Sequence, residues 1–192
     1  MKTKPRTYSL LDEMFASPIT PMPLASQRYT MMGYLEAMAA IKLEPDPSEH
    51  HWRVLADAVN LAESLIEMGE LQDNDGLIRD AVQAMGRTAL RYQEGGPLRL
   101  DGDALKAMTA LVDDMGEVVA TLPHRTMIRA HRYAEKRVRD INEGKRKPGD
   151  VVISVLQCCR SRSSCRDRVE LGLRGHVISS HRCRKFCRHT PP

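Results

Sequence analysis

The chain has 192 residues, of which 42% are hydrophobic and 28% charged, and these proportions exclude a fully disordered protein. Aromatic residues make up 4% whereas methionine occurs 11 times, so the expected core favours helices over a sheet. The charge is unevenly divided: residues 1–150 hold 20 Lys and Arg against 23 Asp and Glu, and residues 151–192 hold 9 against 2.

No apolar run follows Lys2, Lys4 and Arg6 to make a secretory signal, and no segment approaches the length of a membrane span. All five cysteines lie beyond residue 157. The first 150 residues therefore have no cysteine with which to form a disulfide framework, and this fits a reducing compartment. We therefore expect a cytoplasmic protein.

Residues 1–25 are expected to form a leader, because four prolines forbid a long helix there. Ser9 precedes a short apolar segment, which predicts one helical turn over Leu10–Phe15. We expect the apolar side chains Leu10, Leu11, Met14 and Phe15 to pack onto the body of the protein. The alternative is a docking motif that enters a groove on a partner.

Residues 26–144 are expected to form an all-α bundle of about five helices with short loops. The second helix has two neighbouring apolar stripes, which predicts that it is the central one. Ser26 and Ser48 are expected N-caps, and Gly69 is an expected C-cap. The predicted helices span about Gln27–Leu43, Ser48–Met68, Asp75–Gln93, Asp101–Leu122 and Thr126–Glu143.

The fourth predicted helix carries apolar residues at alternating spacings of three and four, which is a seam for a partner helix at a shallow angle. Its members are Leu105, Met108, Val112, Met115, Val119 and Leu122. The expected partner is the fifth helix, folded back after Pro123 as an antiparallel hairpin. The alternative is a homodimer formed through this seam.

The fifth predicted helix separates into a basic stripe and an apolar stripe. The basic stripe is Arg125, Arg129, Arg132, Lys136 and Arg139; the apolar stripe opposite is Met127, His131, Ala134, Val138 and Ile141. Five cations on one face are suited to contacting the phosphates of a nucleic acid. The alternative is a solvated helix face. His131, on the apolar stripe, is expected to be a core histidine.

Residues 145–192 are expected to be a basic linker and an unstructured Cys/Arg-rich tail. Three interpretations compete: a zinc site, a disordered arm for nucleic acid, and the product of a frameshift, which an abrupt change in composition favours. The zinc ligands would come from Cys158, Cys159, Cys165, His181, Cys183, Cys187 and His189, but their spacing lacks a Cys-x-x-Cys pair.

The familiar nucleotide-binding, metalloprotease and serine-hydrolase motifs do not occur in the chain. Glu63 with Glu67, and Asp113 with Glu117, pair at helical spacing, but no histidine accompanies them and a solvated helix face is the expected role. We therefore expect no enzyme, no cofactor and no metal.

Four segments resemble small helical proteins carried on plasmids, prophages and integrated elements of proteobacteria. They are Tyr8–Phe15, Trp52–Asn60, Arg99–Gly102 and Arg125–Arg132. The resemblance covers about residues 5–151 and implies a mobile-element context and no catalytic residues. We expect an accessory or regulatory protein that binds nucleic acid through the basic stripe; the alternative is a protein-interaction module that binds none.

Overall fold

The computed structural model describes residues 7–45, 47–143 and 145, and these residues form six α-helices and no strand. The helices are α1 (Leu10–Phe15), α2 (Leu24–Leu43), α3 (Glu49–Glu67), α4 (Leu77–Gln93), α5 (Gly102–Thr121) and α6 (His124–Asn142). The predicted all-α bundle is confirmed. The tail, with its possible zinc ligands, lies outside the described residues.

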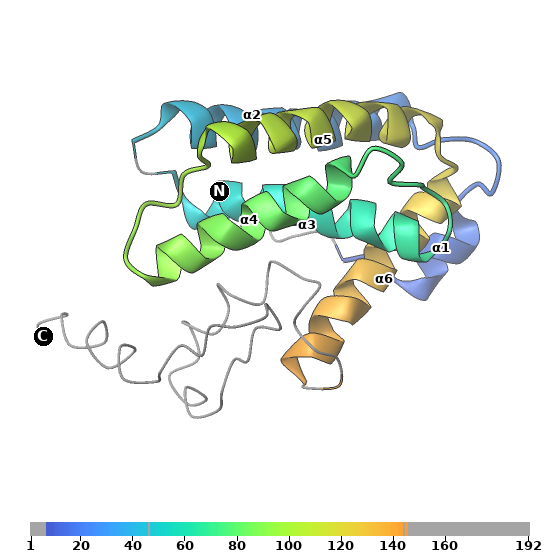
Figure 1. Cartoon of the computed structure of the whole chain (residues 1–192). Coiled ribbons are helices and arrows are strands. Elements are labelled where there is room, and N and C mark those ends of the chain that lie inside the picture. The colour runs from blue at the N-terminus through green and yellow to red at the C-terminus, as the bar shows by residue number, and fades with distance from the viewer. Residues whose placement is uncertain (1–6, 46, 144, 146–192) are drawn as a thin grey trace, which may run out of the picture.

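The helices are stacked in layers (Figure 1). Helices α2 and α5 lie side by side in one layer, and α3 and α4 lie beneath them in the next. Helix α6 runs away from this pair of layers, packing on α3, with the short α1 beside it. This arrangement places α1 and α6 together although more than 100 residues separate them in the chain.

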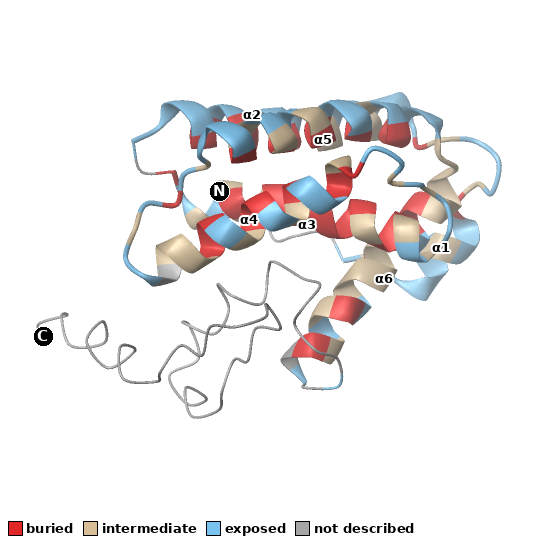
Figure 2. Cartoon of the chain, viewed as in Figure 1, coloured by how far each residue is buried: buried red, intermediate tan, exposed pale blue. Residues whose placement is uncertain are grey.

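Helix α3 is the central element, as its two apolar stripes predicted. It packs on α2, α4, α5 and α6, and its Trp52, Leu55, Val59 and Leu61 have no exposed surface. The inner sides of α2, α4 and α5 complete a core of aliphatic and methionine side chains (Figure 2). A helix surrounded in this way must be apolar over a wide arc.

Local signals set several of the helix ends. Ser9 and Asp12 form a reciprocal capping box on α1, and the Asp101 carboxylate accepts from the Ala104 amide at the start of α5. Gly69 ends α3 at a φ of 74°, where its amide donates to the Ile66 carbonyl and the next amide donates to that of Leu65. This is a Schellman motif, so the predicted C-cap is confirmed.

Two predicted boundaries are wrong. Helix α2 begins at Leu24, with Pro23 as its N-cap in place of Ser26, so the expected end of the leader at residue 25 falls inside this helix. Proline is well tolerated at a helix start, since the first amides have no partner within the helix. The side-chain amide of Gln27 donates to the Met22 carbonyl and helps to fix the position of the chain where it enters α2.

The predicted hairpin of the last two helices is also wrong. Helix α5 packs on α4, α2 and α3, whereas α6 packs on α3 and α1. Met108, Val112, Met115 and Val119 of the seam are at most 2% exposed, and Leu105 and Leu122 pack against the same core. The seam is therefore covered within one chain and offers no surface for the homodimer that was the alternative to the hairpin.

No helix among the described residues is both long enough and apolar enough to cross a membrane.

Candidate functional site

Helix α6 meets the rest of the protein with both of its predicted stripes. On the apolar stripe, Met127 is fully buried, Ile141 is 8% exposed, and His131, Ala134 and Val138 are partly buried. The basic stripe was expected to face solvent. In the structure, three of its five residues instead contact acceptors of the same chain.

Arg125 holds the end of α1. Its Nε donates to the Ala16 carbonyl at 3.2 Å and its Nη2 donates to the Met14 carbonyl at 3.1 Å. The backbone joins the same segments, because the amides of His124 and Arg125 donate to the carbonyls of Thr20 and Ser17, each at 2.9 Å. The ring of Pro123 cannot accept a hydrogen bond and so cannot cap α6. The carbonyls of the loop after α1 accept from the first amides of α6 instead.

The next two arginines of the stripe form ion pairs. Arg129 pairs with Glu70, just after α3, and Arg132 pairs with Glu13 of α1. Of the five residues of the basic stripe, only Lys136 and Arg139 have exposed side chains that form no ion pair or hydrogen bond with another described residue. The surface available for phosphate contacts on α6 is therefore much smaller than the sequence predicted.

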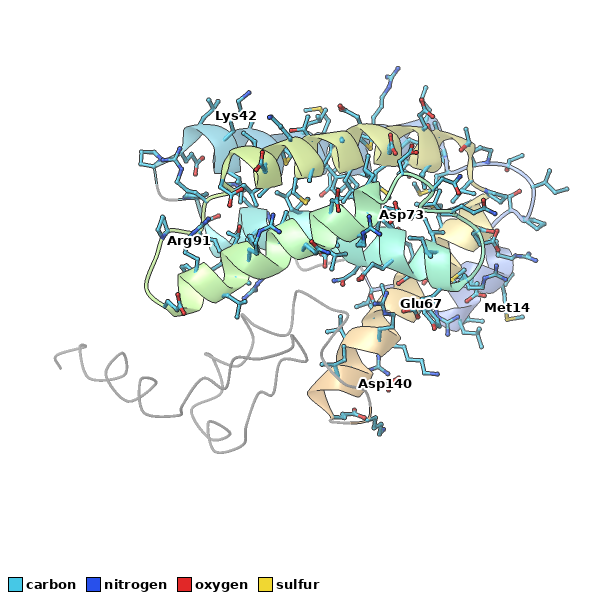
Figure 3. The ribbon with its side chains drawn as sticks, viewed as in Figure 1. Met14, Lys42, Glu67, Asp73, Arg91 and Asp140 are labelled. Atoms are coloured by element: carbon cyan, nitrogen blue, oxygen red, sulfur yellow. The ribbon has the colours of Figure 1, made fainter. Side chains whose placement is uncertain are left out.

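The deepest cation on α6 lies outside the predicted stripe. Arg137 is 2% exposed, and its Nη2 lies 3.2 Å from a Glu63 carboxylate oxygen and 3.4 Å from one of Glu67. Tyr133 donates to Glu67 at 2.8 Å, and Figure 3 shows Glu67 where α3 meets α6. The expectation that Glu63 and Glu67 form a solvated face is wrong, because they bind α6. Asp113 and Glu117 are exposed, as predicted.

Helix α1 has its polar side against the protein and its apolar side toward solvent. Glu13 and the carbonyls of Met14 and Ala16 face α6, while the large apolar side chains are 56–86% exposed. These are Leu10, Leu11, Met14 and Phe15, with Ile19 following in the loop. Figure 3 shows Met14 pointing away from the molecule. The expectation that they pack onto the body is wrong. We call these five residues the α1 face.

A shallow hollow of about 260 Å³ adjoins the α1 face. It lies between α1 and the start of α6, and Leu11, Phe15, His124 and Ile128 contribute to its wall. The hollow extends inward from the α1 face, and Asp12 and Ser17 add polar groups to its wall. A side chain of a docked partner could be partly enclosed there.

Burial shifts the pKa values of His131, Glu135 and Asp57. The ring of Tyr8 is 5.3 Å from the His131 imidazole, and burial lowers the pKa of His131 to about 4. One turn along α6, burial raises the pKa of Glu135. Burial and then the Glu135 charge raise the pKa of Asp57 to about 6, although its side chain stays in contact with solvent. His131 is therefore neutral in the folded protein at neutral pH, as expected of a core histidine.

No group of three or more His, Cys, Asp or Glu side chains in the described part of the chain is placed to hold a metal ion.

No protein-family model, curated protein or solved structure matches the chain. The resemblance to mobile-element proteins thus stays a prediction.

Proposed function

We propose that the chain is a cytoplasmic protein-interaction module that docks the α1 face into an apolar groove of a partner protein. The observation that carries the proposal is the inverted attachment of α1. A short helix that merely closed the bundle would bury its apolar side, because burying that surface is favourable. Here all four large apolar side chains of α1 are more than half exposed.

The polar contacts of α1 fix its orientation. Arg125 and Arg132 bind its C-terminal carbonyls and Glu13 respectively, and the Ser9 capping box fixes its first turn. The α1 face is thus presented in helical form before any partner arrives, which lowers the entropic cost of docking. Its anchors at spacings of three and four residues are those used by helices that bind in grooves.

Site-specific photo-crosslinking in cells tests the proposal. A photoreactive amino acid replaces Phe15, and a matched one replaces Gln83, which is exposed on α4 far from α1 in the sequence. We expect a discrete adduct with another protein from position 15 that is absent from position 83. Leu11→Ser should reduce it, since it removes an anchor while leaving the polar contacts intact. Equal labelling at both positions would refute the proposal.

Nucleic-acid binding through α6 is a second candidate, now limited to the exposed Lys136 and Arg139. These two cations face solvent on a helix that extends away from the bundle. Duplex DNA is titrated at two salt concentrations against the full chain and the double variant K136E/R139E. Binding that weakens with salt and is lost in the variant would support this candidate. Binding that the variant leaves unchanged would place the contacts elsewhere.

A further inference from the structure

Helix α2 carries a second exposed apolar surface, on the side away from the core. Its outer residues recur along one stripe for the whole length of the helix, which is about 30 Å. The large ones are Leu24 (59% exposed), Tyr29 (74%), Met32 (55%), Leu35 (51%) and Leu43 (75%). Ala25 and Ala39 are also exposed there. We call this stripe the α2 face.

An apolar outer surface is not a general property of this layer, as the neighbouring helix α5 shows. Helix α5 lies beside α2 in the same layer (Figure 1), and its outer side is exposed (Figure 2). The residues on that outer side are polar and mostly acidic. Asp103, Lys106, Thr109, Asp113 and Glu117 are all exposed on it. Helix α2 is therefore apolar toward the core and apolar toward solvent, as expected of a helix with a second partner.

The middle of the α2 face contains two opposite charges, Arg28 and Glu36, placed symmetrically about Met32, and a third charge, Lys42, is exposed at the C-terminal end of the helix. Arg28 and Glu36 each lie four residues from Met32, on either side of it along the helix. Both are exposed, and neither forms an ion pair or side-chain hydrogen bond with another described residue. They are eight residues apart, too far to pair with each other along one helix.

We propose that the α2 face binds the α2 face of a second copy of this chain, antiparallel, with the two-fold axis passing by Met32. Two-fold symmetry then places each residue opposite the one equally far beyond Met32 on the other copy. Arg28 meets Glu36 of the second copy twice, once on each side of the axis. Tyr29 meets Leu35, and Ala25 meets Ala39, where two small side chains let the helices approach closely.

The charges also disfavour the parallel arrangement. In a parallel two-fold pair, Arg28 would face Arg28 and Glu36 would face Glu36, and both contacts are repulsive. A different protein as partner would not need complementary charges within one face. The pattern is therefore self-complementary, and this favours a second copy over any other occupant. The pairing does not depend on the α1 face.

Charge reversal in the full chain tests the pairing, by sedimentation over a concentration series under reducing conditions. We expect the wild type to dimerise and to dissociate on dilution. R28E and E36R should each raise the dimer dissociation constant by roughly tenfold, because each converts two attractive contacts into two repulsive ones. An equimolar mixture of R28E and E36R should form a mixed dimer, and the double variant R28E/E36R should dimerise again.

Matched variants keep the test specific. K106E makes the same change of charge on the outer side of α5 and should leave the dimer unchanged, and so should Phe15→Ser on the α1 face. Helix content from circular dichroism confirms that each variant is folded. A monomeric wild type would overturn the proposal. So would single variants that remain dimeric, or a mixture of R28E and E36R that fails to associate. Loss of the dimer in Phe15→Ser would show instead that the α1 face forms it.

Discussion

Replacing Arg137 by alanine should destabilise the protein more than any other single change to a cation on α6. Its side chain is 3% exposed, whereas those of Glu63 and Glu67 are 14% and 29% exposed. Removing the guanidinium leaves Glu63 with an uncompensated charge in a largely dry position. Breaking a buried ion pair typically costs about 3–5 kcal/mol. Because Glu67 can turn toward water, we expect about 2–4 kcal/mol here.

Urea denaturation followed by circular dichroism measures this cost. The matched control is Arg53→Ala, which removes an exposed pair with Glu49 on α3, where the side chains are 39% and 44% exposed. An exposed pair four residues apart on one helix contributes about 0.5 kcal/mol at most. The control should therefore leave the free energy of unfolding almost unchanged.

A second variant separates the ion pair from the packing of the long side chain. R137M combined with E63M replaces both buried charges by apolar groups of similar length. Such replacements are often neutral, since they remove the desolvation cost along with the attraction. We expect the double variant to recover most of the stability that Arg137→Ala loses. The reasoning would be refuted if Arg137→Ala cost no more than Arg53→Ala.

Three further changes test other parts of the fold. Burial holds the pKa of His131 at about 4, below its ordinary 6.5, so its contribution to stability is complete above pH 6.5 and is lost as the pH falls toward 4. Relative to the wild type, H131Q should remove about 1–3 kcal/mol of that acid dependence, measured by urea denaturation across this range; the comparison cancels the opposite contributions of Glu135 and Asp57, whose pKa values are raised. Gly69→Ala should cost about 1 kcal/mol because φ there is 74°, whereas Gly33→Ala, which has open space within α2, should stabilise the protein by about 0.5–1 kcal/mol. Asp73→Ala should cost about 1 kcal/mol, because its carboxylate accepts from two amides at the start of α4, both at 3.0 Å. For Gly69→Ala or Asp73→Ala, a melting temperature equal to that of the wild type would contradict the stated cause.

The sequence predicted the helices well because their signals are local. Apolar spacing identified the buried sides of α3, α4 and α5, and Ser9, Ser48 and Gly69 marked ends that the structure confirms. The same spacing could not say what covers a buried side. An apolar stripe on α5 fits α6, α4 or a second chain equally well, and only the packing of the whole bundle decides among them.

The candidate site depended on contacts between distant segments, and the sequence predicted it poorly. The acceptors of the α6 arginines lie 59 to 119 residues away in the chain, so helical spacing could not reveal them. One usable signal was the excess of acids near the end of α3, at Glu63, Glu67 and Glu70, which complements the arginines of α6. For α1, composition showed that its side chains are apolar but not which side faces the protein. Its polar contacts decide that, and they expose the α1 face.

The outward orientation of α1 can be measured directly by fluorine NMR of the full chain labelled with fluorophenylalanine. The chain has two phenylalanines, Phe15 and Phe186, and Phe15→Leu identifies the first. Because Phe15 is 86% exposed, its signal should show the full shift between H₂O and D₂O that a solvated ring gives. A Phe15 signal without that shift, in a folded monomer, would mean that α1 turns its apolar side inward and would contradict the proposed docking surface.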